Sequence, residues 1–586
     1  MLKKIIFCFI LFVFSFGIYA QVGVDPNDSF YDYLEVWETQ GLVSNLPPLR
    51  PYPVALVKDI LKQVMSGTNE KAKNEAEMLS EKLFGKAFHV EVSGDVNLKI
   101  SDDADAKQAV GFGGVNGDIA FQEKLSASYK LNIAAALNAK ADVIPVFTTK
   151  PYTFRDPADL GPLELFLEMD GNISYGNPGF YIQGGISHNS FGDFYNRGVV
   201  LSPDAQHTAN FSVVVNPGRW SYTHSLFALG ASNNAGKGVY PNKFMMLHSL
   251  DGQIFDWLTA SFYETVVYGD RFDPSYFVPM PFMVPQGITG FDDNLIMGVA
   301  FTVKPFDGFS WSTDVFIDDI SVNDLFKFKF DTKIRGALQT GVKYSPLNSS
   351  FVDLVQMDYT LITPYMYAHK QNIYNPEDCS YITGGSKAIN YQAYTNAGKP
   401  MGSQLAPNSD RIALCVKAEP VKGLNVKLSG CFIRHANVNE SITMEEAIDY
   451  MNAPSGYFLT DGSINNHPHI AYLQADGSMK YKYMSSAWNR FMFMSQKTKM
   501  YVVQAGLDVN YDLPELTFGQ FSVGFGYLFE YIKNWGVQEN MFPGNGTKDF
   551  TNTATEADVE KAIAEWKSNL KNIMNNYVTV SVKYRY

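Results

Sequence analysis

The last ten residues of the chain alternate between apolar and polar side chains. One parity is wholly apolar and consists of Val578, Val580, Val582, Tyr584 and Tyr586. The other parity holds threonine, serine, lysine and arginine. Successive side chains of a β-strand point to opposite faces, so this segment predicts a strand with one apolar and one polar face. The same alternation returns at 90–100, 503–510 and 521–531. The apolar faces are long enough to cross the apolar layer of a membrane as a β-barrel.

The amino terminus has the pattern of an exported protein. Lys3 and Lys4 precede an apolar run at 5–19, and the small residue Ala20 offers a cleavage point. We interpret residues 1–20 as a secretory signal peptide. The alternative, an uncleaved anchor helix, is disfavoured because the run is shorter than the ~20 residues that a spanning helix needs. The sequence has no comparable apolar run after it, which argues against a helical membrane protein.

Composition agrees with long two-faced strands. Aromatic residues make up 14% of the chain and charged residues only 18%, and there are 46 glycines. The net charge of −13 argues against a nucleic-acid partner. Without Cys8 of the signal peptide, three widely spaced cysteines remain, which form neither a disulfide framework nor a zinc motif. We expect two of them, Cys415 and Cys431, on neighbouring strands.

Residues 21–87 have a helical pattern. The first predicted helix is capped by Asp28 and stopped by Gly41, and its apolar residues recur at three- and four-residue spacing. A second covers the apolar positions between 57 and 64, and a third runs from about residue 68 to residue 85. Short amphipathic helices bury little core alone, so we expect them to dock on a larger body.

The connections between the predicted strands alternate in length. Short turns are expected at 216–219, 251–256, 305–309, 345–350, 419–423 and 512–517, and long loops at 187–206, 269–294, 368–410, 436–500 and 532–576. Outer-membrane barrels place short turns in the periplasm and long loops outside, and the pattern predicts ~18 strands. The predicted fold is an all-β, antiparallel outer-membrane β-barrel at 88–586, with 21–87 as a periplasmic helical plug or brace. Two long loops carry helix signals, with capping boxes at Thr443 with Glu446 and at Thr553 with Glu556.

The segment 243–322 contains a predicted strand with His248, a following strand with Glu264 and Tyr268, and a proline-rich loop that ends in an Asp-Asn pair. A strand ending at Asp318 and Asp319 follows. This order of elements resembles the Wzi-type capsule assembly family of outer-membrane proteins, and the segments 31–53 and 191–205 match that family in order. Phe191 and Tyr263 depart from the family pattern, which has tryptophan and serine there. The resemblance implies a barrel closed by periplasmic helices, with a lectin-like outer face that holds surface polysaccharide.

The proline-rich loop at 269–294 is the predicted binding segment. Its apolar run is too hydrophobic to stay in water and its prolines make it stiff, so we expect it to fold into or over the lumen. Sugars are bound by aromatic stacking and by paired polar hydrogen bonds. The predicted polysaccharide-binding residues are Glu264, Tyr268, Arg271, Tyr276, Asp292 and Asn294. The alternative is that this loop only constricts the barrel.

The sequence contains no recognisable catalytic motif, so we expect no enzyme activity and assign no catalytic, cofactor or metal residues. The acidic cluster at 102–105 and the pair His467 and His469 are interpreted as solvated loop residues. Two other functions stay open: a porin or transport channel, since polar inward faces are typical of a water-filled pore, and a surface adhesin. The expected partners are outer-membrane lipid and surface polysaccharide, and the expected state is a monomer in the cell outer membrane.

Overall fold

The structure is a computed structural model that describes residues 22–586 with internal gaps. The gaps are 86–87, 149–157, 160–161, 193, 195–197, 234–237, 291–292, 330, 349–350, 370–388, 453–461, 463–468, 474–478, 484–488 and 543–552. The predicted signal peptide at 1–20, Asp292, Cys379 and His467 lie outside the described residues.

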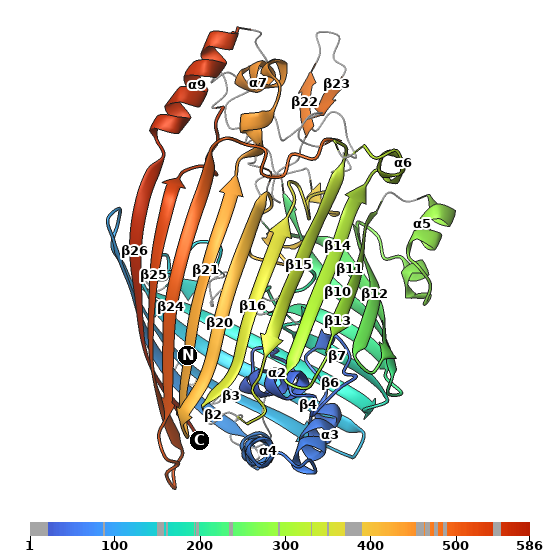
Figure 1. The fold of residues 1–586 in the computed structure, drawn as a ribbon, viewed down its shortest axis with the longest axis vertical. Helices are drawn as coiled ribbons and strands as arrows, with labels where there is room; N and C mark the ends of the chain where they lie inside the picture. The colour runs from blue at the N-terminus through green and yellow to red at the C-terminus, as the bar shows by residue number, and fades with distance from the viewer. Residues whose placement is uncertain are drawn as a thin grey trace, which may run out of the picture.

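Eighteen antiparallel strands of the described chain close into a barrel, as predicted (Figure 1). They are β2 His89–Ser101, β3 Ala106–Ala120, β4 Leu125–Leu137, β6 Leu163–Asn177, β7 Phe180–Ser187, β9 Thr208–Val215, β10 Trp220–Asn233, β11 Gly238–Phe255, β12 Leu258–Gly269, β13 Asn294–Val303, β14 Phe309–Ile320, β15 Ile334–Tyr344, β16 Val352–Ile362, β20 Ser409–Val421, β21 Leu424–Ala436, β24 Lys499–Asp512, β25 Gln520–Trp535 and β26 Lys571–Arg585. The last strand pairs with the first, from Glu91 opposite Arg585 to Ser101 opposite Asn575.

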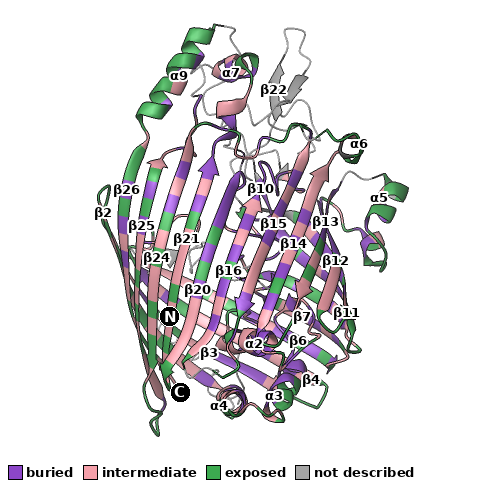
Figure 2. Ribbon diagram, in the orientation of Figure 1, coloured by how far each residue is buried: buried purple, intermediate pink, exposed green. Residues whose placement is uncertain are grey.

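The alternation of side chains sets the two faces of the wall. Val580 and Val582 are each 49% exposed on the outer face, as predicted from the last strand, while Tyr577 on the other parity is buried. Figure 2 shows this change of exposure along β24, β25 and β26. Cys415 and Cys431 lie on the paired strands β20 and β21, as expected. No helix among the described residues has the length and apolar character needed to cross a membrane.

Short turns join the strands at one end of the barrel, called here the turn end (Figure 1). Longer loops join most of them at the other, the loop end, where the connection at 102–105 between β2 and β3 is short. Two predicted turns start too early. β11 continues to Phe255, with the turn at 256–257, and β20 continues to Val421, with the turn at 422–423. In β11 the reason is that Asp251 is buried in the wall and accepts hydrogen bonds from Ser249 at 2.9 Å and Ser221 at 3.4 Å.

Three helices lie at the turn end: α2 Ser29–Thr39, α3 Val54–Met65 and α4 Glu70–Phe84 (Figure 1). Asp28 caps α2 as predicted, and Asn69 caps α4 by accepting from two backbone N–H groups. The helices share one apolar core, which includes Tyr181 and Val214 of the barrel wall. The helices therefore dock on the barrel, as their small size requires.

Loops fill the lumen beside β10–β16. The segment after β7 turns inward, where β8 (Ser190–Phe191) pairs with β1 (Leu49–Arg50) of the amino-terminal region. The ring of Phe191 packs against Tyr263 of β12 with their centroids 4.9 Å apart. The same core contains Phe227 and Phe316 of the wall and the loop residues Val199, Val200, Tyr365, Tyr367 and Tyr394. The expectation of wholly polar inward faces is therefore wrong for these strands, because their apolar side chains are covered by inserted loops.

The remaining elements belong to the loops. They are β5 Ala158–Asp159, η1 Pro274–Phe277, α5 Met283–Thr289, α6 Val322–Phe326, β17 Ile389–Asn390, β18 Thr395–Asn396, β19 Lys399–Pro400, η2 Val438–Ser441, α7 Met444–Met451, β22 His469–Leu473, β23 Met479–Tyr483 and α9 Glu556–Ser568.

The two loop helices at the loop end differ in how well their caps were predicted. The box of Thr443 and Glu446 at α7 is confirmed. The second box is formed by Thr555 and Asp558 instead of Thr553 and Glu556. The helix starts later because the N–H groups of residues 553 and 554 donate to Oδ1 of Asn452, which follows α7.

Candidate functional site

The loop between β12 and β13 lies against the outer face of the barrel wall and not over the lumen. Tyr276 and Phe282 pack against Val266 and Tyr268 of β12 and Met246 of β11. These wall residues have the same parity as Leu250 and Phe262, which are exposed on the outside. In Figure 1, α5 lies outside the strands. The predicted location is thus wrong, because the inward parity of β12 is already covered by the core around Tyr263 and Val267.

Two of the predicted binding residues in this loop, Arg271 and Tyr276, both contact Asp293, which is not among the predicted residues. Arg271 forms an ion pair with Asp293, with Nη1 3.1 Å from Oδ1, and Nη2 contacts Asp273 at 3.3 Å. The hydroxyl of Tyr276 donates to Asp293 at 2.6 Å. Burial and the neighbouring Asp293 carboxylate raise the pKa of Tyr276, so its hydroxyl stays protonated and can donate. This arrangement fastens the loop to itself.

The other predicted residues that the structure describes are buried. Glu264 is 0% exposed and accepts from the backbone N–H of Phe282 at 2.7 Å, which anchors the loop to β12. Tyr268 is fully buried beneath the loop, whereas Asn294 donates to the carbonyl of Gln392, at 2.8 Å. The structure therefore places Glu264, Tyr268, Arg271 and Tyr276 at the outer loop and Asn294 on the inward face of β13, and the contacts given above for these residues are structural. Their role in binding polysaccharide stays a prediction.

The motif histidine belongs to a polar row under the same loop. His224, His248 and Glu264 are direct neighbours across β10, β11 and β12. Nε2 of His248 is 3.4 Å from Oε2 of Glu264, and its ring centroid is 4.1 Å from that of Phe282. A polar row on the outer face of a membrane barrel is costly when it meets lipid. The loop covers the row and so removes this cost. This contact with the loop explains why the polar motif residues His248 and Glu264 can lie on the outer face of the wall.

A charged groove of about 700 Å³ lies at the loop end, above β2, β3, β4 and β6. Its charged lining residues are Lys99, Asp103, Asp105, Lys107, Lys140, Asp142 and Glu164. Lys99 and Lys140 cross it in ion pairs with Asp142 at 3.1 Å and Glu164 at 3.2 Å. Sequence reasoning missed this groove, although the acidic cluster at 102–105 marked its rim. The groove offers charged donors and acceptors on the side where the loops emerge.

The connection after β4 reaches across the loop end beside this groove. The N–H of Val146 donates to Glu530 of β25 at 3.0 Å, and Gln504 of β24 donates to the Val146 carbonyl at 3.2 Å. The next residue, Phe147, packs on His435 with ring centroids 5.7 Å apart. The loop end of the lumen is therefore crossed by chain that is bonded to the far strands.

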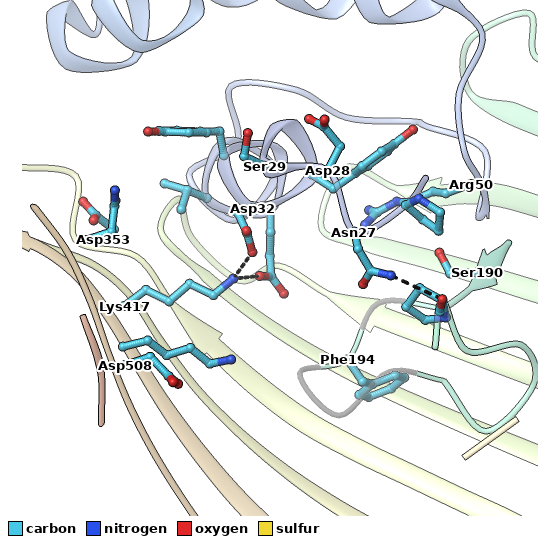
Figure 3. A pocket seen from close by; sticks show the side chains of 18 of the residues that line it. Asn27, Asp28, Ser29, Asp32, Arg50, Ser190, Phe194, Asp353, Lys417 and Asp508 are labelled. Atoms are coloured by element: carbon cyan, nitrogen blue, oxygen red, sulfur yellow. Dashed lines mark hydrogen bonds and ion pairs between the residues drawn. The ribbon is translucent and has the colours of Figure 1, made fainter. Parts of the chain in front are cut away.

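A second cavity, of about 650 Å³, lies at the turn end between α2, the inserted loop and the wall (Figure 3). Glu35 of α2 contacts Lys343 and Lys417 of the wall, both at 2.9 Å, and Asp32 contacts Lys417 at 2.7 Å. Burial by itself would raise the pKa of Glu35, but the two lysines hold it well below its usual range. These charged contacts fix α2 inside the barrel, so this end of the lumen is braced.

The fold was compared with known proteins. No family model matches the chain, and no curated protein matches it. Among solved structures, Wzi of Escherichia coli superimposes with a TM-score of 0.52 at 10% identity, over 96% of this chain and 99% of that one. Wzi is described as an outer membrane protein involved in group 1 capsule assembly and as a carbohydrate-binding β-barrel.

Other solved structures align less closely. OccAB2 of Acinetobacter baumannii has a TM-score of 0.38 at 9% identity, over 85% of this chain and 98% of that one. OccK10 (OpdN) of Pseudomonas aeruginosa has a TM-score of 0.37 at 8% identity, over 85% and 99%. The resemblance to the Wzi-type family is therefore confirmed at the level of the fold.

Proposed function

We propose that this protein resides in the outer membrane and holds surface polysaccharide at its loop end, as a lectin-like barrel without catalytic chemistry. The observation that carries the proposal is the combination of a lumen filled beside β10–β16 with a charged groove left at the loop end. The likeness in fold to a carbohydrate-binding β-barrel supports it. The loop end faces outward in barrels with this pattern of short turns and long loops.

The chemistry of the groove fits a hydrated polymer. Lysine ammonium groups donate to hydroxyl, carboxylate or sulfate oxygens, and carboxylates accept from sugar hydroxyls. Such contacts are individually weak at an exposed site. Retention of a long polymer therefore depends on many copies of the protein at the cell surface, each of which binds a repeat unit of the same polymer. The proposal therefore predicts low affinity for short oligosaccharides and strong retention of the polymer.

The channel alternative is less favoured, because core residues occupy the lumen beside β10–β16 and α2 braces the turn end. Recordings of the purified barrel in planar bilayers test it, and a large stable conductance would favour a channel. The adhesin alternative would be favoured by binding to a host or matrix protein without affinity for glycan.

Substitutions in the groove test the proposed site. Lys99→Ala with Lys140→Ala should lower polysaccharide retention on cells several-fold, while Lys422→Ala in a short turn should have no effect. Arg271→Ala and Tyr276→Ala test the predicted residues of the outer loop in the same assay. Retention that survives the lysine double variant, with equal barrel yield, would remove the groove from the binding site. Retention unchanged in all variants and absent binding to the purified polymer would overturn the function itself.

A further inference from the structure

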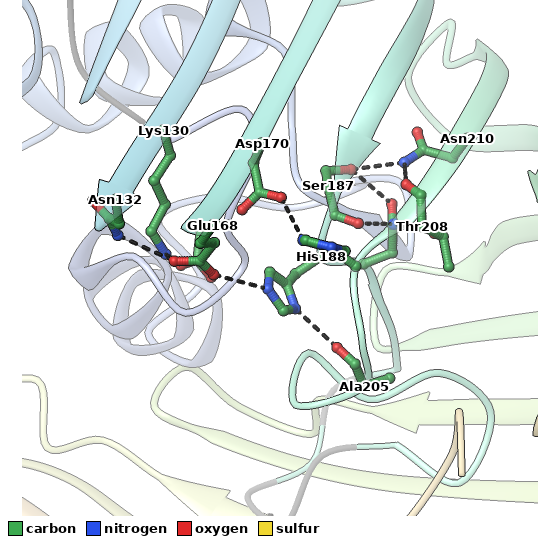
Figure 4. A network of polar contacts seen from close by, with 12 residues as sticks. Lys130, Asn132, Glu168, Asp170, Ser187, His188, Ala205, Thr208 and Asn210 are labelled. Carbon is green, nitrogen blue, oxygen red and sulfur yellow. Dashed lines mark hydrogen bonds and ion pairs between the residues drawn. The ribbon is translucent and has the colours of Figure 1, made fainter. Parts of the chain in front are cut away.

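A cluster of two histidines and one aspartate lies on the luminal side of the barrel (Figure 4). Asp170 comes from β6, and His188 and His207 come from the beginning and the end of the inserted loop at 188–207. One ligating atom of each residue lies within 4.8 Å of those of the other two. Two imidazoles and a carboxylate are a donor set that suits Zn²⁺ and related transition-metal ions.

The carboxylate of Asp170 is buried and only half used. The residue is 5% exposed. Its Oδ1 lies 2.9 Å from Nδ1 of His207. Its Oδ2 is buried and has no hydrogen-bond partner among the residues that the structure describes. A buried carboxylate oxygen without a donor is costly, which indicates that a further group belongs beside it.

His188 is held so that one ring nitrogen is directed into the network. Its Nδ1 lies 2.8 Å from the carbonyl of Ala205, and a carbonyl can only accept, so Nδ1 carries a proton there. Histidines that bind metals are commonly oriented by such a bond from the other ring nitrogen. Nε2 lies 3.5 Å from Oε1 of Glu168. In the neutral ring both of these atoms are acceptors, an arrangement that needs a proton or a cation between or beside them.

The charges of the network are unbalanced. Lys130 of β4 lies 3.0 Å from Asp25 and 3.4 Å from Glu168, and Asp170 adds a third carboxylate. With both histidines neutral, one lysine faces three carboxylates. Three carboxylates around one lysine leave a negative potential that favours a further cation beside them.

We propose that Asp170, His188 and His207 bind a divalent transition-metal cation, with Zn²⁺ as the preferred ion. The side chain of His207 is 42% exposed, which leaves the ion a path from the solvent. Three protein ligands leave a further coordination position for water. The ion would tie both ends of the inserted loop to β6, and through the Lys130 network to Asp25 of the amino-terminal segment. This site is independent of the proposed binding of polysaccharide.

The test uses the full-length barrel, folded in detergent, without a polyhistidine tag and freed of metal by a chelator. Zinc chloride is titrated by calorimetry, and bound metal is measured by mass spectrometry after gel filtration. The expected result is one Zn²⁺ per chain, with visible d–d bands on replacement by Co²⁺. His207→Gln keeps a donor for Asp170 but loses the ligand nitrogen, and Asp170→Asn keeps the shape but loses the charge. Each should weaken Zn²⁺ binding about tenfold or more.

A matched control variant and a test of folding distinguish loss of the metal site from misfolding of the barrel. His369→Gln changes a histidine that contacts Gln392 outside the cluster, and it should leave Zn²⁺ binding unchanged. Heat-modifiable mobility verifies that each variant is folded. The proposal is overturned if the folded wild-type protein binds no more Zn²⁺ than the His188→Gln, His207→Gln double variant. Preferential binding of Ca²⁺ or Mg²⁺, or wild-type affinity in both single variants, would also overturn it.

Discussion

Asp293 holds the loop between β12 and β13 together, because its carboxylate accepts from both Arg271 and Tyr276 of the same loop. Hydrogen bonds to a charged acceptor contribute about 1.5–3 kcal/mol each when they are buried. The carboxylate of Glu264 then attaches this loop to β12 by accepting from the N–H of Phe282. At the residue scale, a single substitution in one of these side chains is therefore expected to weaken the attachment of the loop.

Tyr276→Phe should loosen the loop without disturbing the barrel. The ring still fills its place against Tyr268, while the donor to Asp293 is lost, and we expect about 1–3 kcal/mol less stability for local attachment. Protease cleavage within 270–293 of the folded barrel measures the change. Tyr344→Phe, at an exposed wall position, is the control. An unchanged cleavage rate in Tyr276→Phe would contradict this role.

Glu75 of α4 is a largely buried carboxyl with a side chain that is 13% exposed, and it accepts from Nε1 of Trp37 at 3.1 Å. Burial raises its pKa to about 7, above its usual value of 4.5. The folded state therefore binds a proton that the unfolded state releases between these values, and the cost of burying the charge is fully present above pH 7 and absent below pH 4.5.

Glu75→Gln should thus stabilise the helical region at pH 8, by up to ~3 kcal/mol, with a smaller gain at pH 5. Resistance of α4 to proteolysis in increasing urea, measured at both pH values, gives the comparison. Glu77→Gln, an exposed neighbour on the same helix, should change neither. A gain at pH 5 that equals the gain at pH 8 would show that Glu75 does not titrate as described.

At the scale of elements, α7 and α9 are joined through one asparagine. Asn452, which ends α7, accepts from the backbone N–H groups of Thr553 and Ala554, and α9 begins only after these residues. The cap of α9 then comes from Thr555, whose hydroxyl accepts from the N–H of Asp558. The start of one helix is therefore set by the end of another.

Thr555→Ala should destabilise α9 by about 1 kcal/mol through loss of the cap. Thr553→Ala should have little effect, since only its backbone N–H is used. Hydrogen exchange of the amides at the start of α9 distinguishes the two variants. Faster exchange in Thr553→Ala than in Thr555→Ala would show that Thr553, as predicted from the sequence, is the N-cap of α9.

At the scale of the whole molecule, the barrel depends on the closure of β26 against β2. Beyond the paired strands, the N–H of Tyr586 donates to the carbonyl of Val90 at 2.9 Å, and the N–H of Val90 donates back at 3.1 Å. Closure removes both strand edges, which would otherwise be open to pairing with other chains. The ring of Tyr586 is 45% exposed on the outer face at the turn end.

Tyr586→Asp should reduce membrane insertion, because an aromatic ring suits the interface between lipid and water and a carboxylate does not. Tyr586→Phe keeps the ring and should insert normally. Yield in the outer-membrane fraction and heat-modifiable mobility report the outcome. Equal yield for the Asp and Phe variants would show that the ring has no part in closure.

The sequence by itself determined the strands, their approximate number and the division into short turns and long loops. It could do so because alternation in strands and the capping of helices such as α2 are local patterns. The alternation stops being informative at 263–269, where Val266 and Val267 are both apolar and both faces of β12 are buried. Only the tertiary structure decided that the loop after β12 lies outside, since the inward face is taken by the inserted loops.

Contacts between distant residues were likewise decided by the tertiary structure. Glu35 meets Lys343 and Lys417 only because α2 enters the lumen. Asp170 and His207 meet because β6, β7 and β9 are paired side by side and the intervening loop turns inward. No local pattern encodes such meetings, because they depend on the closure of the barrel and on the packing of loops within it.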